Sequence, residues 1–547
     1  MGGLALRHRL NFAKPRVINP ESILRPWIIL VTIIVSTIVA VISSFTVMIA
    51  SSSIQGALTI SDTENMWVSL IFLLTVAVSV PIANWFSERQ GYKKLFVIGL
   101  TLFFLSTLFC GLTSSYTVML LCRVFAGMGA GIIFPNSLTL LSLVFSQKKR
   151  TFAIAIYVAG SFGLGTILGV FLGGYLTEFH SWRSIFTSLV PLAPFLLLSV
   201  WMFFPETEKK RNGPFDYLGT LFYLTFIWSF VVWLANVKAS WNTDGFSSTF
   251  SQVTLTVGIC ALIAFVIWDR KVKYPLFKLS LFKVRPFTLG GLAVFAVGST
   301  FFSTTGNISS IFENELFYSQ YRAGLFQIPF GAMIGFFGAL SGLLSEKVGI
   351  RTLALLGMAI TAVSCFMSYM ITIQSGHTQY FWLQIIRGTG IGLSLGPLTA
   401  LALKRIQPED LGQAAVLVTL FRQLGASIGS IFTDLMQGLR VPFHLLRFGE
   451  QMSLNSPELI KHMENVEDLL TTQAGSIPTL ASVGPTGFFE EASVRSYHEL
   501  VNYASAQAKI LSINDAYWII GWVLTTFFVV IGFFIVRAKI KERFGAC

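Results

Sequence analysis

Charged residues are scarce in this sequence. Asp, Glu, Lys and Arg make up 12% of its 547 residues, whereas a soluble domain carries about 25%. Hydrophobic residues reach 54%, and the mean hydropathy is +0.70. The apolar residues form runs of about 18 residues or more, the length that crosses roughly 30 Å of hydrocarbon. The composition excludes a soluble protein and predicts an all-α polytopic membrane protein.

Cysteine and the common catalytic motifs are nearly absent. Only five cysteines occur, and none forms a C-x-x-C pair, so we expect no disulfide framework and no metal site. The sequence has no P-loop, G-x-S-x-G or H-E-x-x-H motif, which argues against an enzyme, a bound cofactor and ATP as an energy source. The net charge of +13 comes from basic residues scattered between the apolar runs, so a nucleic-acid partner is not expected.

The apolar runs predict about fourteen transmembrane helices. Two six-helix bundles, 27–204 and 288–537, are expected, with two extra helices in a linker at 205–287. The runs centre on 27–50, 67–86, 95–114, 118–145, 151–176, 184–204, 217–236, 251–268, 288–311, 323–344, 352–373, 379–403, 412–437 and 516–537.

The charges around these runs predict the orientation. Fourteen spans place both termini on one side of the membrane. With the N-terminal segment 1–26 and the tail 538–547 in the cytoplasm, most Lys and Arg lie in cytoplasmic loops, as the positive-inside rule requires. The long segment 439–513 is then an external loop. Apolar spacing over Glu458–Leu470 predicts a short helical cap there; the alternative is a docking surface for a periplasmic adaptor.

An internal repeat relates the two bundles. The segments Ser87–Lys93 and Ser345–Arg351 both fit S-E-(R/K)-x-G-x-(K/R) and lie 258 positions apart. A second echo, Arg123 and Arg387 with the glycines and proline that follow each, has an offset of 264 positions. Two features at nearly one offset indicate duplication of a six-span unit, the architecture of carriers that expose a shared cavity to alternate sides.

These motifs resemble the major facilitator superfamily. Asn84–Lys94 resembles the signature loop between spans two and three, Arg123–Gly131 the motif of span four, and Gly169–Gly174 the antiporter motif G-P-x-x-G-G. Arg422–Gly429 resembles the R-Q-L-G-G-S-I-G stretch of span thirteen, typical of the fourteen-span EmrB- and QacA-like drug:proton antiporters. The resemblance implies the major facilitator fold and possible proton coupling.

Two departures from that pattern concern coupling. The subgroup usually has an Asp in span one, whereas Ser43–Ala50 contains no acid, and Val170 replaces the proline of the antiporter motif. The acids left to carry a proton are Asp434 within span thirteen, and Glu313 or Glu315 at the outer end of span nine.

Two groups of residues are predicted to serve gating and packing. In each signature loop a glycine permits a tight turn, and the charges around it either latch the bundle ends or form an ordinary solvated loop. In span five, small residues four positions apart lie on one helix face, where close helix approach provides static packing or a surface on which the bundles rock. The gating residues are Glu88, Arg89, Gly91, Lys93, Glu346, Lys347, Gly349 and Arg351, and the packing residues are Ser161, Gly165, Gly169, Gly173 and Gly174.

Three arginines lie within predicted spans. Arg422 is near the middle of the bilayer, where a charge costs at least ~2.5 kcal/mol, and should face the bundle interior. Arg123 and Arg387 are nearer the outer ends and could instead extend to the interface. We assign Arg123, Arg387, Arg422, Asp434 and Glu313 to substrate binding or coupling. Because positive groups dominate this set, we expect an anionic, zwitterionic or neutral substrate.

The sequence therefore predicts a multi-pass protein of a bacterial inner membrane that exports a small amphipathic or drug-like compound, with the lipid bilayer as its surroundings. One alternative is a transporter for a specific metabolite or siderophore with different or no ion coupling. A second is a membrane receptor or scaffold without transport, which the retention of both signature loops argues against.

Overall fold

The computed structural model describes residues 24–206, 213–237, 242, 244–407, 410–451, 461 and 485–544. The described chain is helical and contains no β-strand. Most of the predicted cytoplasmic segment 1–26, and nearly all of the predicted cap Glu458–Leu470, lie outside these residues.

The N-terminal half contains six spans, two of them made of several helical pieces. The fifth span changes from α-helix to a π-helical stretch, η1 (Ala159–Leu164), and back, so it is not the uniform helix that the sequence predicted. The other elements are α1 (Arg25–Ile49), α2 (Ser51–Leu58), α3 (Asp62–Gln90), α4 (Tyr92–Leu112), α5 (Tyr116–Val144), α6 (Gln147–Val158), α7 (Gly165–Phe179), α8 (Ser184–Thr187) and α9 (Ala193–Phe203).

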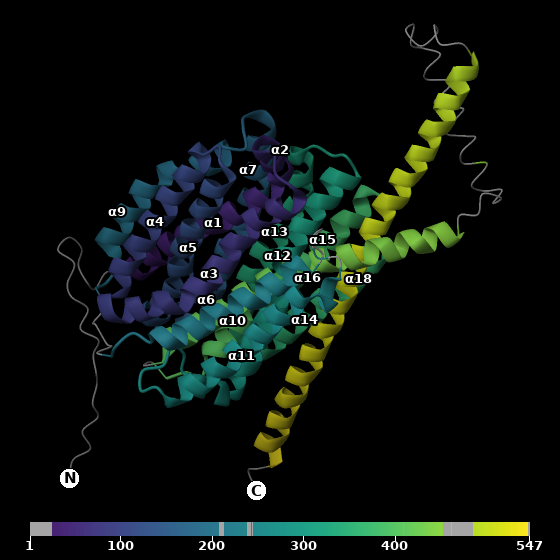
Figure 1. Cartoon of the computed structure of the whole chain (residues 1–547). Helices are drawn as coiled ribbons and strands as arrows, with labels where there is room; N and C mark the ends of the chain where they lie inside the picture. Colours follow the sequence, from purple (N-terminus) through teal and green to yellow (C-terminus); the bar gives the residue numbers. More distant parts are fainter. Residues whose placement is uncertain are drawn as a thin grey trace, which may run out of the picture.

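The C-terminal half repeats this order after two linker helices. The linker helices pack on each other and lie at the seam between the halves, beside α3 and α16 (Figure 1). The elements are α10 (Tyr217–Asn236), α11 (Thr249–Lys271), α12 (Arg285–Ser310), η5 (Ile311–Glu315), α13 (Gln320–Leu344), η6 (Ser345–Gly349), α14 (Ile350–Met367), α15 (His377–Leu403), α16 (Leu411–Gln451) and α18 (Pro485–Phe544).

The number of membrane crossings agrees with the sequence prediction. Thirteen segments of the described chain are long and apolar enough to span a bilayer, and one of these, Gln320–Met370, has 51 residues. At 1.5 Å per residue a straight helix of that length would measure about 77 Å. The segment instead folds back at Gly349, so that α13 and α14 both pack against α15. Fourteen crossings result.

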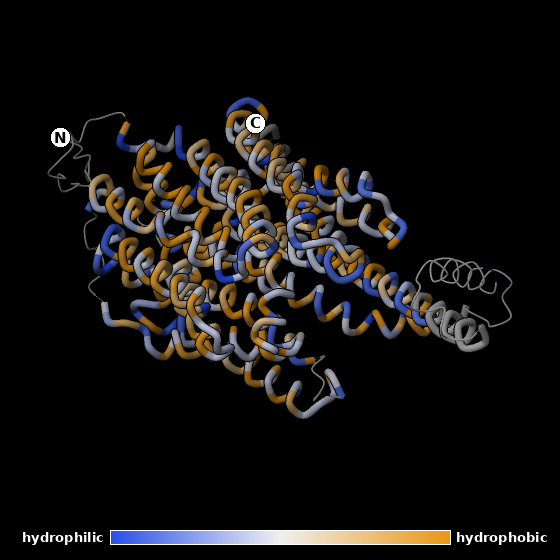
Figure 2. The backbone as a smooth tube through the Cα atoms, turned by 90° about the horizontal axis from the view of Figure 1, so that it is seen from above, coloured by the Kyte–Doolittle hydropathy of each residue, from blue (hydrophilic) through white to orange (hydrophobic). Residues whose placement is uncertain are grey.

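The outer surface of the bundle is suited to lipid. Large apolar side chains face outwards, among them Phe195 (73% exposed), Trp201 (64%) and Phe533 (62%). Figure 2 shows hydrophobic residues along the helices and hydrophilic residues mostly toward their ends. A water-soluble protein rarely leaves so much contiguous apolar surface uncovered, and the pattern is that of a protein embedded in hydrocarbon.

The described parts of the predicted external loop 439–513 are largely helical. α16 continues to Gln451 and α18 already begins at Pro485, so both extend beyond the bundle in different directions (Figure 1). The 60 residues of α18 correspond to about 90 Å, three times the hydrocarbon thickness. Hydropathy could not reveal these extensions, because polar sequence continues each apolar helix.

The two signature turns have nearly the same backbone conformation. Gly91 has φ 98° and ψ 142°, and Gly349 has φ 91° and ψ 137°. Both values lie in a region that is almost reserved for glycine. The side of the molecule that carries these turns is called the loop side below. Near Gly91 it also holds the start of α1 and the end of α9, because Arg25 Nε donates to Phe203 O (3.1 Å) and Lys93 Nζ to Trp201 O (2.7 Å).

We expect Gly349→Ala to destabilise the protein through its backbone alone. A Cβ atom at Gly349 would contact nothing within 4 Å, so the cost is the strained φ, about 1–3 kcal/mol. The matched control is Gly376→Ala, which is equally open but has φ −73°. Thermal unfolding in detergent should give a lower midpoint for Gly349→Ala only; equal midpoints for the two variants would contradict the prediction.

Candidate functional site

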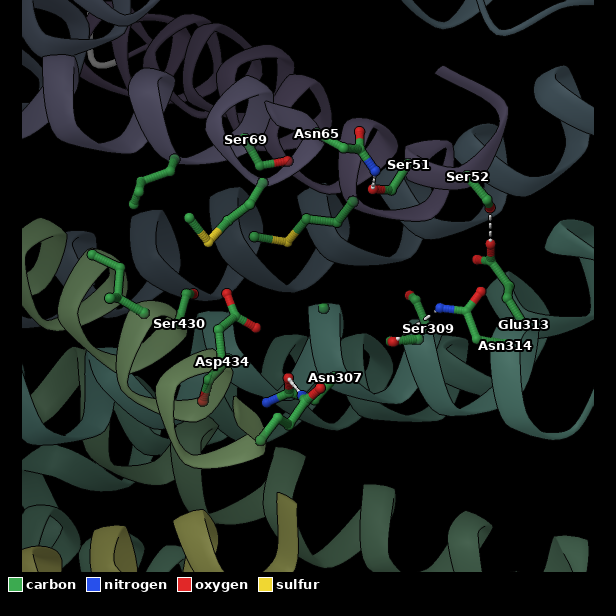
Figure 3. A pocket seen from close by; sticks show the side chains of 18 of the residues that line it. Ser51, Ser52, Asn65, Ser69, Asn307, Ser309, Glu313, Asn314, Ser430 and Asp434 are labelled. Atoms are coloured by element: carbon green, nitrogen blue, oxygen red, sulfur yellow. Dashed lines mark hydrogen bonds between the residues drawn. The ribbon is translucent and has the colours of Figure 1, made fainter. Parts of the chain in front are cut away.

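A cavity of about 440 Å³ lies between the two halves, on the side opposite the loop side (Figure 3). α2 and the beginning of α3 line it from the N-terminal half, and α12, η5 and α16 line it from the C-terminal half. Of its 24 lining residues, 13 are uncharged and polar, four are charged, and none is aromatic. The cavity therefore offers mostly hydroxyl and amide groups to a solute.

Three carboxylates and one ammonium group line this cavity. Asp434 and Glu313 face it from α16 and η5, and Figure 3 shows both side chains. Glu315 accepts a hydrogen bond from Lys509 Nζ of α18 at 2.8 Å. The balance of charge in the cavity is acidic, which the sequence could not indicate because Lys509 and the three acids come from distant segments.

Glu313 connects the two halves at the cavity rim. Its Oε2 accepts a hydrogen bond of 2.6 Å from the hydroxyl of Ser52, and Gln320 Nε2 donates to the same hydroxyl at 3.0 Å. Its other oxygen, Oε1, is buried without a hydrogen-bond partner. Beside it, Ser53 Oγ donates to Gln320 Oε1 at 2.9 Å. Glu313 and Gln320 of one half are thus both hydrogen-bonded to serines of α2 in the other half.

On the loop side the two halves are in direct contact. A Cβ atom at Gly412, the second residue of α16, would lie 2.7 Å from the Tyr92 hydroxyl and 3.7 Å from Glu88 Oε1. A Cβ atom at Gly396 of α15 would lie 3.6 Å from the Cβ of Ala155 in α6. The structure therefore has the cavity on one side and closely packed helices on the other.

The first signature loop takes part in this contact, whereas the second is exposed. Glu88 Oε1 accepts a hydrogen bond from Asn84 Nδ2 (3.1 Å), and the Arg89 guanidinium lies 5.2 Å from the Trp85 ring centre. In the second copy the side chains of Glu346 and Lys347 are exposed and that of Arg351 is half-buried. The two copies share their backbone turn but have different surroundings.

The small residues of the fifth span divide between two partners. Cβ atoms at Gly165, Gly169 and Gly173 would meet α1 of the same half, within 3.0 Å of Val41, Phe45 and Thr46 respectively. Ser161 is fully buried in η1. Gly174 instead meets α13 of the other half, 2.5 Å from Gln320 O. The regular stripe thus packs within one half, and close approach between the halves occurs on a neighbouring face.

That neighbouring face is formed by glycines on both helices. A Cβ atom at Gly163 of η1 would lie 2.4 Å from Gly335 Cα, and one at Gly324 of α13 would lie 2.4 Å from Val170 O. Because glycine has no Cβ atom, the two helix backbones can approach this closely. Small residues allow such packing in membranes, where helices associate without a hydrophobic driving force. The sequence prediction named Gly174 but missed Gly163 and the glycines of α13.

Arg123 and Arg387 are buried, each within its own half, so neither extends to the membrane interface. Arg123 is 1% exposed; its Nε donates to Val68 O (3.2 Å) and its Nη1 to Ser43 Oγ (3.1 Å). Arg387 is 0% exposed; it donates to the carbonyl oxygen and hydroxyl of Ser364 and to the hydroxyls of Thr304 and Ser368. Ser43, at the position where the related subgroup usually has Asp, is thus a hydrogen-bond acceptor for Arg123.

Arg422 differs because it reaches across to the other half. It extends from α16, and its guanidinium carbon lies 4.4 Å from the Phe162 ring centre and 5.8 Å from that of Phe134. The Tyr157 hydroxyl of α6 also contacts it. Its side chain is 2% exposed, and no carboxylate of the described chain pairs with it. None of the three arginines lines the cavity of Figure 3.

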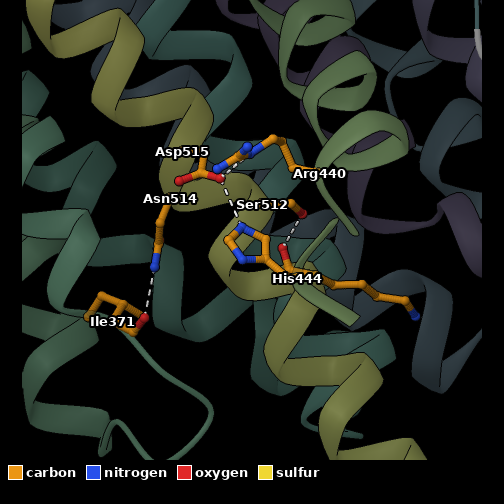
Figure 4. A network of polar contacts seen from close by, with 7 residues as sticks. Ile371, Arg440, His444, Ser512, Asn514 and Asp515 are labelled. Atoms are coloured by element: carbon orange, nitrogen blue, oxygen red, sulfur yellow. Dashed lines mark hydrogen bonds and ion pairs between the residues drawn. The ribbon is translucent and has the colours of Figure 1, made fainter. Parts of the chain in front are cut away.

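A polar network that the sequence did not predict ties α18 to α16 on the cavity side (Figure 4). Asp515 Oδ2 accepts a hydrogen bond from Arg440 Nε at 2.7 Å and lies 2.9 Å from His444 Nε2. The adjacent Asn514 donates to Ile371 O at 2.8 Å. The sequence motif around Asn514 and Asp515 marked the start of the last span, but nothing in it indicated partners some 70 residues earlier.

Comparisons with known proteins agree with the fold. The family profile of the Major Facilitator Superfamily matches residues 33–430. The multidrug export protein EmrB of Escherichia coli (strain K12) is 26% identical over 497 residues, 90% of this chain and 92% of EmrB. The fatty acid resistance protein FarB of Neisseria gonorrhoeae is 26% identical over 418 residues, 75% of this chain and 80% of FarB. A bacterial homologue of the human lysosomal transporter Spinster, in an inward-facing and occupied conformation, has a similar structure (TM-score 0.56, 17% identity, covering 93% and 97% of the two chains).

Proposed function

Because the chain belongs to the major facilitator superfamily, it is a secondary transporter rather than an enzyme, and we propose that it exports a small amphipathic solute from a bacterial cell by alternating access. The observation that carries this proposal is the cavity of about 440 Å³ between two related halves that touch on the loop side. Alternating access requires such a cavity to open to one side at a time.

We place the loop side in the cytoplasm, with both termini there. Arg25, Arg89, Lys93 and Arg150 lie at loop-side helix ends, which fits the positive-inside rule. The cavity then faces outwards, the orientation from which an exporter releases its solute. The extensions of α16 and α18 would project on the same outer side, where a periplasmic adaptor could dock.

The similar proteins support export of amphipathic compounds. EmrB is named as a multidrug export protein and FarB as a fatty acid resistance protein. Fatty acids and many drugs combine an apolar body with one polar or charged end. A solute of that type suits the combination of a polar outer cavity and the apolar, arginine-bearing centre described above.

Proton coupling is proposed through Glu313 and Asp434. Both carboxyl groups face the cavity, and that of Glu313 accepts the hydrogen bond from Ser52 that links the halves at the rim. Protonation would replace this charge-assisted hydrogen bond with a weaker, neutral one. A proton arriving from outside would in this way loosen the link and favour opening of the rim.

Reconstitution in proteoliposomes tests this proposal. We expect a panel of amphipathic solutes to move faster than in protein-free vesicles and to respond to an imposed pH gradient. Glu313→Gln and Asp434→Asn should weaken the response to the gradient, whereas Asp244→Asn, at an exposed acid of the linker, should leave it unchanged. Transport that is indifferent to the gradient in the unmodified protein would refute proton coupling but not transport.

A second candidate substrate class is a hydrophilic metabolite or siderophore. The favouring observation is the cavity lining, which is mainly hydroxyl and amide groups and lacks aromatic residues, whereas pockets for drug-like ligands are mostly apolar. Competition between a lipophilic and a hydrophilic probe in the same vesicles distinguishes the two classes.

A further inference from the structure

A cluster of aromatic rings from both halves lies just beyond the inner end of the cavity. Phe45 of α1 stacks on Phe302 of α12 (ring centres 5.3 Å apart, planes at 16°) and meets Phe301 edge-on at 5.4 Å. Phe162 of η1 also meets Phe301, at 5.9 Å. All four rings are at most 2% exposed. The cluster is therefore dry, and its contacts cross the seam between the halves.

Arg422 belongs to this cluster. It lies eight residues before Ser430, a cavity-lining residue of the same helix, which places it about 12 Å closer to the loop side. Its guanidinium rests on Phe162 at 4.4 Å, and its Nε has no hydrogen-bond partner. A buried guanidinium without a carboxylate is costly in a membrane, and a planar ring face is only a partial substitute for an anion.

The other two arginines keep their hydrogen bonds within one half, although Arg123 Nη2, like Arg422 Nε, is buried without a hydrogen-bond partner. Arg123 and Arg387 donate to carbonyl and hydroxyl oxygens of their own halves, and each also lies over a ring of that half. Those contacts do not cross the seam. The contacts of Arg422 with Phe162 and Tyr157 do cross it, so a separation of the halves on the loop side would break them.

From this arrangement we infer that Arg422 is the anion-binding residue of the substrate site and that the substrate is an anion with an aromatic or flat apolar body. The inference rests on the proposed export function. When the loop side opens, the four rings separate and present apolar faces beside an unpaired guanidinium. When it closes, Phe45 and Phe302 stack on each other and Phe162 covers Arg422, so the rings replace the substrate and expel it.

The acidic outer cavity is consistent with outward movement of an anion from the central site. An anion released toward Asp434 and Glu313 meets charges of its own sign and is not retained there. A cation would be held by those carboxylates and would gain nothing from Arg422. Both halves line the cavity and the central site alike, but the central site is preferred as the binding site because it lies at mid-membrane depth.

The test uses three probes built on one naphthalene ring: a carboxylate, a primary amine and an alcohol. Initial rates are measured in proteoliposomes of the full chain with the loop side facing the probe. We expect the carboxylate to move at least about tenfold faster than the amine, and Arg422→Gln to reduce carboxylate transport at least about tenfold while changing the alcohol little. Arg422→Lys, which keeps the charge, should retain a preference for the carboxylate.

Each other outcome has a distinct meaning. If the amine is preferred, or if Arg422→Gln slows all three probes equally with an unchanged thermal midpoint, the inference is wrong although transport stands. If no probe moves faster than in protein-free vesicles, both the proposed export and this inference fail. Phe162→Leu, which removes the ring under Arg422 without adding charge, provides a second variant should Arg422→Gln fold poorly; it should preserve the carboxylate preference while slowing release.

Discussion

A disulfide between Ala155→Cys and Gly396→Cys should stop transport. The two Cβ atoms would be 3.6 Å apart, within the range of natural disulfides. Ala155 lies on α6 in one half and Gly396 on α15 in the other, on the loop side, so the bond would hold that side closed. We expect oxidation to abolish transport and a reductant to restore it, measured as initial rates in proteoliposomes.

The control for this experiment is a disulfide that does not cross the seam. Ser229→Cys and Gly258→Cys would join α10 to α11 within the linker, with a separation of 3.4 Å. Both pairs are placed in a background whose native cysteines are replaced by serine, and cross-linking is verified by mass spectrometry. The linker pair should cross-link without loss of transport. Full transport by cross-linked Ala155–Gly396 protein would show that the loop side need not open.

Gly163→Ala should impair transport far more than Gly335→Ala. These glycines face each other across the seam, but a Cβ atom at Gly163 would lie 2.4 Å from Gly335 Cα, whereas one at Gly335 would lie 3.7 Å from Gly163 Cα. The first change forces η1 and α13 apart, and overpacking of this kind costs about 1–3 kcal/mol. Since 1.4 kcal/mol is tenfold in an equilibrium, we expect a loss of transport rate between about fivefold and a hundredfold.

Gly335→Ala serves as the matched control, because it adds the same methyl group to the same interface in ordinary van der Waals contact. Its transport rate should remain within about twofold of the unmodified protein. Rates and thermal midpoints are measured together, so that loss of folded protein is separated from loss of movement. Equal behaviour of the two variants would mean that the closeness of η1 and α13 is not important for transport.

The sequence predicted the spans and the repeat well because each depends on local chemistry. A long apolar run indicates a membrane span without any information on its neighbours. The turns at Gly91 and Gly349 likewise require glycine whatever surrounds them. The sequence also predicted that Arg422 faces the interior, and the structure buries it, because charge is expensive in hydrocarbon.

What the sequence could not predict depends on how helices rotate and pack. Depth along the span distinguished Arg422 from Arg123 and Arg387, but nothing in the sequence indicated that Arg422 alone of the three crosses the seam. The stripe from Ser161 to Gly173 has an unmistakable spacing, but the spacing does not say which helix it meets. Lys509 lies on the polar extension of α18, and Asp515 contacts residues on the extension of α16. Hydropathy detects neither extension.

One helix, α16, contributes residues to the loop-side contact, the aromatic cluster, the cavity and the polar network around Asp515. Along α16, Gly412 lies in the closed contact, Arg422 on the aromatic rings, Asp434 in the cavity and Arg440 against Asp515. Gly412 and Arg440 are 28 residues apart, about 42 Å of helix. A stiff rod of that length acts as a lever: a tilt of about 5° at one end displaces the other by roughly 4 Å. An event sensed at the cavity rim can thus be transmitted to the loop-side contact without any chain of side-chain rearrangements between them.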